Sequence, residues 1–292
     1  MDSNKQAILA ILLAAVLFTA MGMFVKILTP SLPAMEVVFA RNLFGLMWIL
    51  GALFLQPPKQ IGGKPFVLAL RGFAGGSAML AYFYNMSVMP LGTAYAFSNS
   101  SPIFLALFSV LFIHDKVALK TWMAILIGFS GILLISNPKG TDLTFLGVCI
   151  GLYSGIGAAL AYLSIAKLAK LYDPRIIIFS LMLFGTILPL LTQIVPYTSY
   201  PIALFEPFII PTFKECLLIV ALGLVSTYAQ IYLTKAYSIG NPPIIGAISY
   251  STIFLATLAG VILGDKIPNA LVILGMLLIV CGGILAVLHK HS

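Results

Sequence analysis

Runs of about twenty apolar residues fill this chain, and they constrain its fold more than any other feature. A helix that crosses the hydrocarbon core of a bilayer needs roughly 20 such residues. Hydrophobic residues make up 61% of the 292 positions and charged residues only 8%, against about 25% charged residues in a soluble domain. We therefore expect an all-α integral membrane protein with ten transmembrane helices. The expected spans are residues 7–28, 35–55, 66–88, 91–113, 120–136, 145–168, 175–196, 213–237, 241–263 and 269–288.

The first apolar run begins after Lys5 and extends through Leu28. It is longer than the 7–15-residue core of a signal peptide, and no clear small-residue cleavage site follows it. We therefore expect an uncleaved first span. The connections between spans are short, and the longest covers residues 197–212, so no soluble domain is expected.

The positive charges are distributed unequally between the two sides of the expected spans. If the N-terminus is inside, eleven Lys and Arg residues lie on the inner side, four lie on the outer side, and Arg41 lies within the second span. The positive-inside rule then places both termini in the cytoplasm, which requires an even number of spans. We expect a multi-pass protein of a bacterial-type cytoplasmic (inner) membrane. The net charge of +8 reflects this topology and does not indicate a nucleic-acid partner.

The second half of the sequence repeats the first at an offset of 150 residues. An odd number of spans, five, separates equivalent positions, so the two copies should face opposite sides of the bilayer. We predict two inverted five-helix repeats, residues 1–140 and 141–292, an arrangement typical of secondary transporters. The residues that match are Ser101 with Ser251, Ile103 with Ile253, Phe104 with Phe254, Leu105 with Leu255, Ala106 with Ala256, Asp115 with Asp265, Lys116 with Lys266 and Tyr82 with Tyr232.

Several motifs in both halves resemble those of the EamA-type drug/metabolite transporters. The resemblance implies ten helices in two EamA repeats around a central cavity, lined mainly by spans one, three, four, six, eight and nine. Asp115 and Asp265 stand where this family often has Glu, which keeps the charge. The family carries many different substrates, so the resemblance does not define the cargo. The motifs are Tyr82–Asn85, Pro90–Ala94, Ser101–Phe104, Asp115-Lys116, Gly128 and Gly131 in the first half, and Ser251–Phe254, Asp265-Lys266 and Gly282-Gly283 in the second.

Arg41 is the first candidate for a substrate-binding residue. A charge at the centre of a membrane helix costs at least about 2.5–3.5 kcal/mol, and the planar guanidinium suits a carboxylate or phosphate. The hypothesis is an anionic docking group. The alternatives are that Arg41 extends to the outer interface or pairs with Glu36. Arg71 is expected to extend into the cytoplasmic headgroups.

Uncharged polar residues cluster in the middle of four spans that the repeat relates in pairs. Their polar faces can converge at the repeat interface, where alternating access requires a site. The alternative is that serine and asparagine side chains simply hold helices together. The remaining candidate substrate-binding residues are Tyr82 in span three, Tyr95, Ser98, Asn99 and Ser101 in span four, Tyr228, Gln230 and Tyr232 in span eight, and Ser249 and Tyr250 in span nine.

These residues predict a secondary transporter that moves a small amphipathic metabolite, such as an amino acid, a nucleoside-like or a vitamin-like compound. The partners expected are this solute and membrane lipids, with no nucleic acid. The sequence is compatible with a monomer and with a homodimer. The sequence lacks a G-x-x-x-x-G-K-[ST] motif, so ATP does not drive transport directly. The sequence does not distinguish proton coupling, exchange and facilitated diffusion as the energy source of transport. It also does not distinguish import from export.

Two other classes of protein are weighed against a transporter. An ion channel or facilitative pore would need repeated charged or carbonyl-lined segments that form a selectivity filter, and none is evident in the sequence. An intramembrane enzyme would need a catalytic cluster, whereas the three histidines lie at helix ends or in the C-terminal tail. No cofactor or metal is expected, because the three cysteines are scattered over separate spans.

Overall fold

The computed structural model describes residues 3–58, 60, 62–101, 103–104, 107–108, 119–135, 143–195, 198, 202–240 and 242–288. All regular elements in these ranges are helical. The longer helices are α1 (Ser3–Leu28), α2 (Ala34–Leu55), α3 (Pro65–Val88), α6 (Leu119–Ile135), α7 (Phe145–Leu168), α8 (Pro174–Thr192), α9 (Phe213–Ile239) and α12 (Ala270–Leu288). The shorter ones are α4 (Leu91–Ser98), α10 (Pro242–Ser249), α11 (Ser251–Ile262) and the 3-10 turn η1 (Ala203–Phe205).

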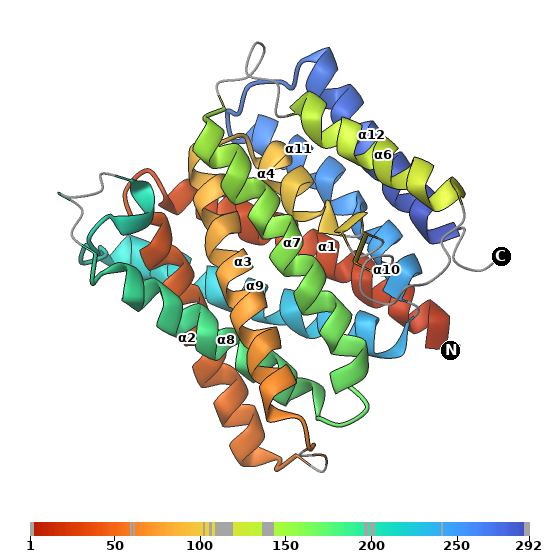
Figure 1. Cartoon of the computed structure of the whole chain (residues 1–292). Coiled ribbons are helices and arrows are strands. Elements are labelled where there is room, and N and C mark those ends of the chain that lie inside the picture. Colours follow the sequence, from red (N-terminus) through yellow and green to blue (C-terminus); the bar gives the residue numbers. More distant parts are fainter. Residues whose placement is uncertain are drawn as a thin grey trace.

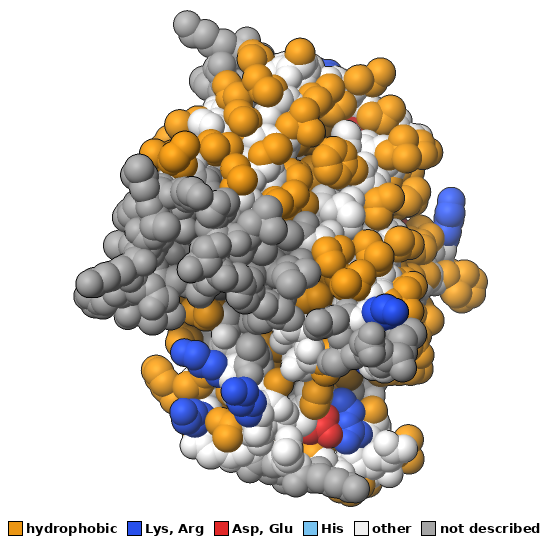
Figure 2. All heavy atoms as spheres, turned by 90° about the vertical axis from the view of Figure 1, so that its right-hand side faces the viewer, with side chains coloured by type: hydrophobic (Ala, Val, Ile, Leu, Met, Phe, Trp, Pro, Cys, Tyr) orange, Lys and Arg blue, Asp and Glu red, His pale blue; other side chains and the backbone are white. Residues whose placement is uncertain are grey.

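The described helices carry the apolar surface of a membrane protein. Six of them, α1, α2, α3, α7, α8 and α9, are long and apolar enough to cross a bilayer, and parts of α6, α11 and α12 form shorter apolar helices. Large apolar side chains are left almost fully exposed, such as Phe54 at 92% and Ile210 at 93%. Figure 2 shows hydrophobic side chains over much of the described part of one face, with most of its visible Lys and Arg in the lower half.

The two halves of the chain are packed into one another. α1 lies along α9, α3 packs against α7 and α8, and α2 packs against α8. α4 contacts α11, and α6 lies beside α12 at one edge of the molecule (Figure 1). Each of these contacts joins a helix of the first half to a helix of the second, so neither half buries its apolar surface alone.

Two of the expected spans are interrupted in the middle. The expected helix at 91–113 stops where α4 ends at Ser98, and after a turn at Asn99 and Ser100 helical structure resumes at Ser101. The sequence also predicted one helix over 241–263, but the structure divides it into α10 and α11 at Tyr250. The two interruptions lie 150 residues apart, at equivalent positions of the sequence repeat. Pro102, which the sequence suggested as a kink, lies outside the described residues.

Hydrogen bonds from Arg175 connect the start of α8 to the end of α2. Asp173 caps α8 by accepting from the backbone N–H of Arg175 at 2.9 Å, and the two side chains form an ion pair at 2.7 Å. Arg175 also donates to the carbonyl oxygens of Ala52 and Gln56. The hydrogen bond from the Arg175 guanidinium holds the pKa of the Asp173 carboxyl below its usual value.

Candidate functional site

A cavity of about 80 Å³ lies between the two halves of the chain. This volume is several times the roughly 10–15 Å³ that a single water molecule needs. Its walls come from α1, α3, α4, α7, α9, α10 and α11, which correspond to expected spans one, three, four, six, eight and nine, and from Leu181 of α8.

Six of the residues that the sequence proposed for substrate binding line this cavity: Tyr82, Tyr95, Ser98, Asn99, Gln230 and Ser249. The rings of Tyr82 and Tyr95 are 5.1 Å apart and nearly perpendicular, and the Tyr95 hydroxyl donates to the carbonyl of Phe18. The Asn99 amide donates to the carbonyl of Tyr95 at 3.0 Å. The wall is thus apolar over its aromatic rings and polar at the interruption after α4.

The other proposed residues lie elsewhere. Tyr228 is 43% exposed and packs edge-on against Trp48 at 6.1 Å, on the outside of the bundle. Tyr232 is half-buried and packs against a buried apolar cluster that includes residues of α1, α7 and α9. Ser101 and Tyr250 are buried. The Tyr250 hydroxyl has no hydrogen-bond partner among the described residues. The cavity lining does not include these four side chains, so their part in substrate binding stays a prediction.

Arg41 is completely buried, at 0% exposure, and does not line the cavity. Its guanidinium donates to the Asn42 side-chain oxygen at 2.5 Å and to the Ser226 carbonyl at 3.4 Å. Neither alternative from the sequence describes it: the side chain does not extend to the interface, and the Glu36 carboxylate instead accepts from the Ile209 N–H at 2.8 Å. The hypothesis that Arg41 docks an anion would require the helices around it to separate.

The lining residues that were not among the sequence-based candidates include Arg71, Tyr162 and Tyr237. Arg71 is only 2% exposed, so the expectation that it extends into the headgroups is wrong. The rings of Tyr162 and Tyr237 are stacked, with centroids 5.1 Å apart. Gly75 follows Arg71 by one helical turn on the same face, but Gly45 follows Arg41 at the same spacing, so this pattern does not single out Arg71. No sequence signal joins Tyr162 on α7 to Tyr237 on α9.

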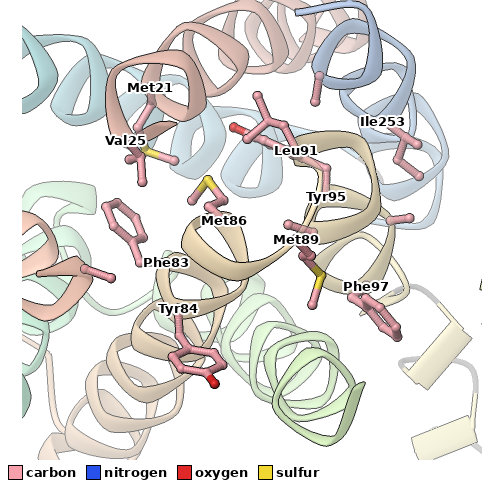
Figure 3. Packing of buried hydrophobic residues seen from close by; sticks show 14 of the residues in the cluster. Met21, Val25, Phe83, Tyr84, Met86, Met89, Leu91, Tyr95, Phe97 and Ile253 are labelled. Carbon is pink, nitrogen blue, oxygen red and sulfur yellow. The ribbon is translucent and has the colours of Figure 1, made fainter. Parts of the chain in front are cut away.

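One end of the cavity is closed by a packed apolar cluster. It includes Met21 and Val25 of α1, Phe83 and Met86 of α3, and Leu91 of α4 (Figure 3). These side chains come from the ends of three helices and are all nearly inaccessible. The cluster therefore separates the cavity from that side of the molecule.

An ion pair lies at the same end and joins the two halves. Lys26, at the end of α1, lies 2.9 Å from the Asp265 carboxylate in the connection after α11. Lys26 also donates to the Met89 carbonyl at 3.1 Å, and Asp265 accepts from the Leu91 N–H at 2.8 Å. Asp115 and Lys116, the repeat partners of Asp265 and Lys266, lie outside the described residues.

The sequence matches the EamA-like transporter family over residues 5–137. An "Uncharacterized transporter" of Helicobacter pylori is 34% identical, over 95% of this chain and 93% of that protein. The "Pseudopaline exporter CntI" of Pseudomonas aeruginosa is 29% identical, over 96% of this chain and 95% of that one. The "S-adenosylmethionine uptake transporter" of Rickettsia bellii is 22% identical, over 92% and 89% of the two chains.

The fold is also found among solved structures. One crystal structure superimposes with a TM-score of 0.67 at 19% identity, and the match covers 99% of both chains. At this level of identity the likeness concerns the fold alone. Because the match covers nearly all of both chains, that protein has the helical arrangement of Figure 1 over almost its whole length.

Proposed function

The chain belongs to the EamA-like transporter family, and from this premise we propose that it carries a small amphipathic metabolite across the cytoplasmic membrane by alternating access. That it is a multi-pass membrane transporter, and not an enzyme, follows from the family and from the relatives named as transporters. The cargo and the mechanism are the proposal. The named relatives transport pseudopaline and S-adenosylmethionine, which fits an amino-acid-like, nucleoside-like or vitamin-like solute here.

The observation that carries the mechanism is a cavity between the halves, next to two interrupted helices at equivalent repeat positions. Transporters built from inverted repeats place their substrates near the bilayer midplane, beside discontinuous helices. We therefore propose ten spans in two inverted five-helix repeats, residues 1–140 and 141–292. The shorter apolar helices in α6, α11 and α12 support the spans beyond the six long ones. Both termini would be cytoplasmic.

The cavity extends into the half of the bundle that this topology makes the inner one. Arg71 and Gly75 come from the first half of α3, whereas Tyr162 and Tyr237 come from the second halves of α7 and α9. The apolar cluster and the Lys26–Asp265 ion pair then close the outer end. We propose that the structure represents an outer-closed state, and that the carrier rocks to open this end and close the inner one.

Counterflow in proteoliposomes tests the function. The purified protein is reconstituted, and uptake of radiolabelled S-adenosylmethionine, amino acids, nucleosides and vitamins is measured with the same unlabelled solute inside. We expect saturable uptake of at least one of them, accelerated by solute on the far side. Uptake without saturation or acceleration would indicate a channel, and a chemically altered solute would reveal an enzyme.

Asn99→Ala should impair transport without preventing membrane insertion. Asn99 lines the cavity at the interruption after α4, where its amide can contact a solute. The loss of one hydrogen bond of about 0.5–1.5 kcal/mol corresponds to roughly a two- to tenfold loss of apparent affinity. Ser130→Ala is the control, because that hydroxyl is exposed on α6 and bonds to its own helix. Equal uptake by both variants would remove Asn99 from the site.

A further inference from the structure

The cavity contains a buried positive charge that has no negative partner among the described residues. Arg71 lines the cavity, and no carboxylate of the described residues does. We propose that the cavity takes a zwitterionic metabolite of the amino-acid type, with Arg71 as the docking group for its carboxylate. This inference rests on the proposed transport function and names its substrate class. The carboxylates of the described residues that lie elsewhere are Glu36, Asp173, Glu206, Glu215 and Asp265.

The two buried arginines differ in how their guanidinium groups are satisfied. Arg41 donates to the Asn42 side chain and to the Ser226 carbonyl, and it contacts two methionine sulfurs. The Nε atoms of both arginines are buried without a partner among the described residues. Arg71, however, makes no hydrogen bond to any described residue, so its whole guanidinium is unpaired there. A buried charge that is left without a partner is strongly destabilising. A bound anion would therefore be stabilised more strongly at Arg71 than at Arg41.

The protein shapes a place for the Arg71 guanidinium. Gly75 follows one helical turn later, and a Cβ atom at Gly75 would overlap Arg71 Nη1 and approach the Leu181 Cδ1 to 2.6 Å. The absence of a side chain at this position lets the guanidinium lie against the α3 backbone. Tyr162, on the neighbouring helix α7, lines the same cavity. The group is thus held at the cavity wall, where its planar fork suits the two oxygens of a carboxylate.

Two further features of the lining fit a zwitterion, one its ammonium group and the other its carboxylate. Gln230 is 4% exposed, lines the cavity, and its Oε1 atom is buried without a hydrogen-bond partner in the described structure. This oxygen only accepts, so it needs an N–H or O–H donor, which an ammonium group supplies. The N-terminus of α11 also reaches the cavity at Thr252, and no side chain caps it. Its partial positive charge adds to the attraction for an anion.

Ligand-induced thermal stabilisation of the purified, full-length protein tests this assignment. The probes are the twenty proteinogenic L-amino acids, each compared with its methyl ester, and inorganic phosphate. We expect at least one free acid to raise the melting midpoint, and its ester, which lacks the negative charge, to bind at least tenfold more weakly. This comparison uses the unaltered protein, so it does not depend on the folding of any variant.

Variants then locate the docking group. Arg71→Gln should weaken binding of the stabilising acid at least tenfold, and Arg71→Lys should restore part of it. Gly75→Ala, which displaces the guanidinium without removing it, should also weaken binding. Lys235→Gln is the matched control, because it removes a cation from an exposed position of α9 outside the cavity. It should bind the acid as the wild type does.

Several outcomes would overturn the proposal. These are equal binding of acid and ester, stabilisation by inorganic phosphate alone, stabilisation by no free acid, and unchanged binding in a folded Arg71→Gln protein. If counterflow of a neutral or purely cationic solute is observed alongside any of these, the transport function stands and only the substrate class is wrong. If no solute shows counterflow, the proposed function itself fails.

Discussion

Replacing Asp265 by lysine is expected to open the outer end of the cavity and to reduce transport at least tenfold. The change brings two lysines together where Lys26 and Asp265 now lie 2.9 Å apart. It also removes the acceptor of the Leu91 N–H at the start of α4. A like-charge contact in a partly buried place costs several kcal/mol, and each 1.4 kcal/mol changes a conformational equilibrium tenfold. The outer-closed state should therefore lose its predominance.

The accessibility of a cysteine in the cavity measures this equilibrium. Met21 belongs to the apolar cluster and also lines the cavity, so Met21→Cys is introduced after the three native cysteines have been replaced by alanine. An impermeant thiol reagent added from outside should label it at least ten times faster in the Asp265→Lys protein. The exchanged pair, Lys26→Asp with Asp265→Lys, should slow labelling again.

The control for this experiment is Lys214→Glu, a charge reversal at an exposed position near the start of α9. It should leave labelling and transport unchanged, because Lys214 lies outside both the ion pair and the cavity. Unchanged labelling in Asp265→Lys would mean that the ion pair does not hold the outer end closed. Faster labelling from the cytoplasmic side instead would mean that the assigned orientation is inverted.

Gly131→Leu is expected to destabilise the protein by about 3 kcal/mol, at the upper end of the usual cost of overpacking. Gly131 of α6 and Gly275 of α12 lie where the two helices touch. A Cβ atom at Gly131 would lie 2.6 Å from the Gly275 carbonyl oxygen and 2.8 Å from the Ile279 nitrogen. Both are backbone atoms, so no side chain can rotate away, and the helices must separate to accept the leucine.

The measurement is the fraction of protein that remains monodisperse after heating in detergent. Gly51→Leu provides the control, because a Cβ atom at Gly51 on α2 would meet nothing within 4 Å. That change should be neutral or slightly stabilising, since glycine costs a helix about 1 kcal/mol relative to good helix formers. A Gly131→Leu protein that survives heating as well as Gly51→Leu does would show that α6 and α12 are not held in close contact.

The cavity residues show where sequence reasoning succeeded and where it stopped. The sequence pointed to Tyr95, Ser98 and Asn99 as a polar run in one span, and the structure brings all three to the cavity wall. The same reasoning named Tyr228, which lies on the outside against Trp48. Tyr228 and Gln230 are two positions apart, so they point to different faces of α9, and hydropathy does not say which face turns inward. In lipid both faces of a helix are largely apolar, and the amphipathic pattern that orients helices in soluble proteins is weak.

The apolar runs by themselves determined that the chain is a helical membrane protein, because a backbone in hydrocarbon must satisfy its own hydrogen bonds. Its motifs determined the transporter family. Tertiary structure alone decided which arginine borders the cavity, because Arg41 and Arg71 are both isolated cations in apolar helices and only their neighbours differ. It also decided that Lys26 meets Asp265, an ion pair between residues 239 positions apart. Such contacts depend on how helices rotate and pack against one another, and local sequence does not encode that rotation.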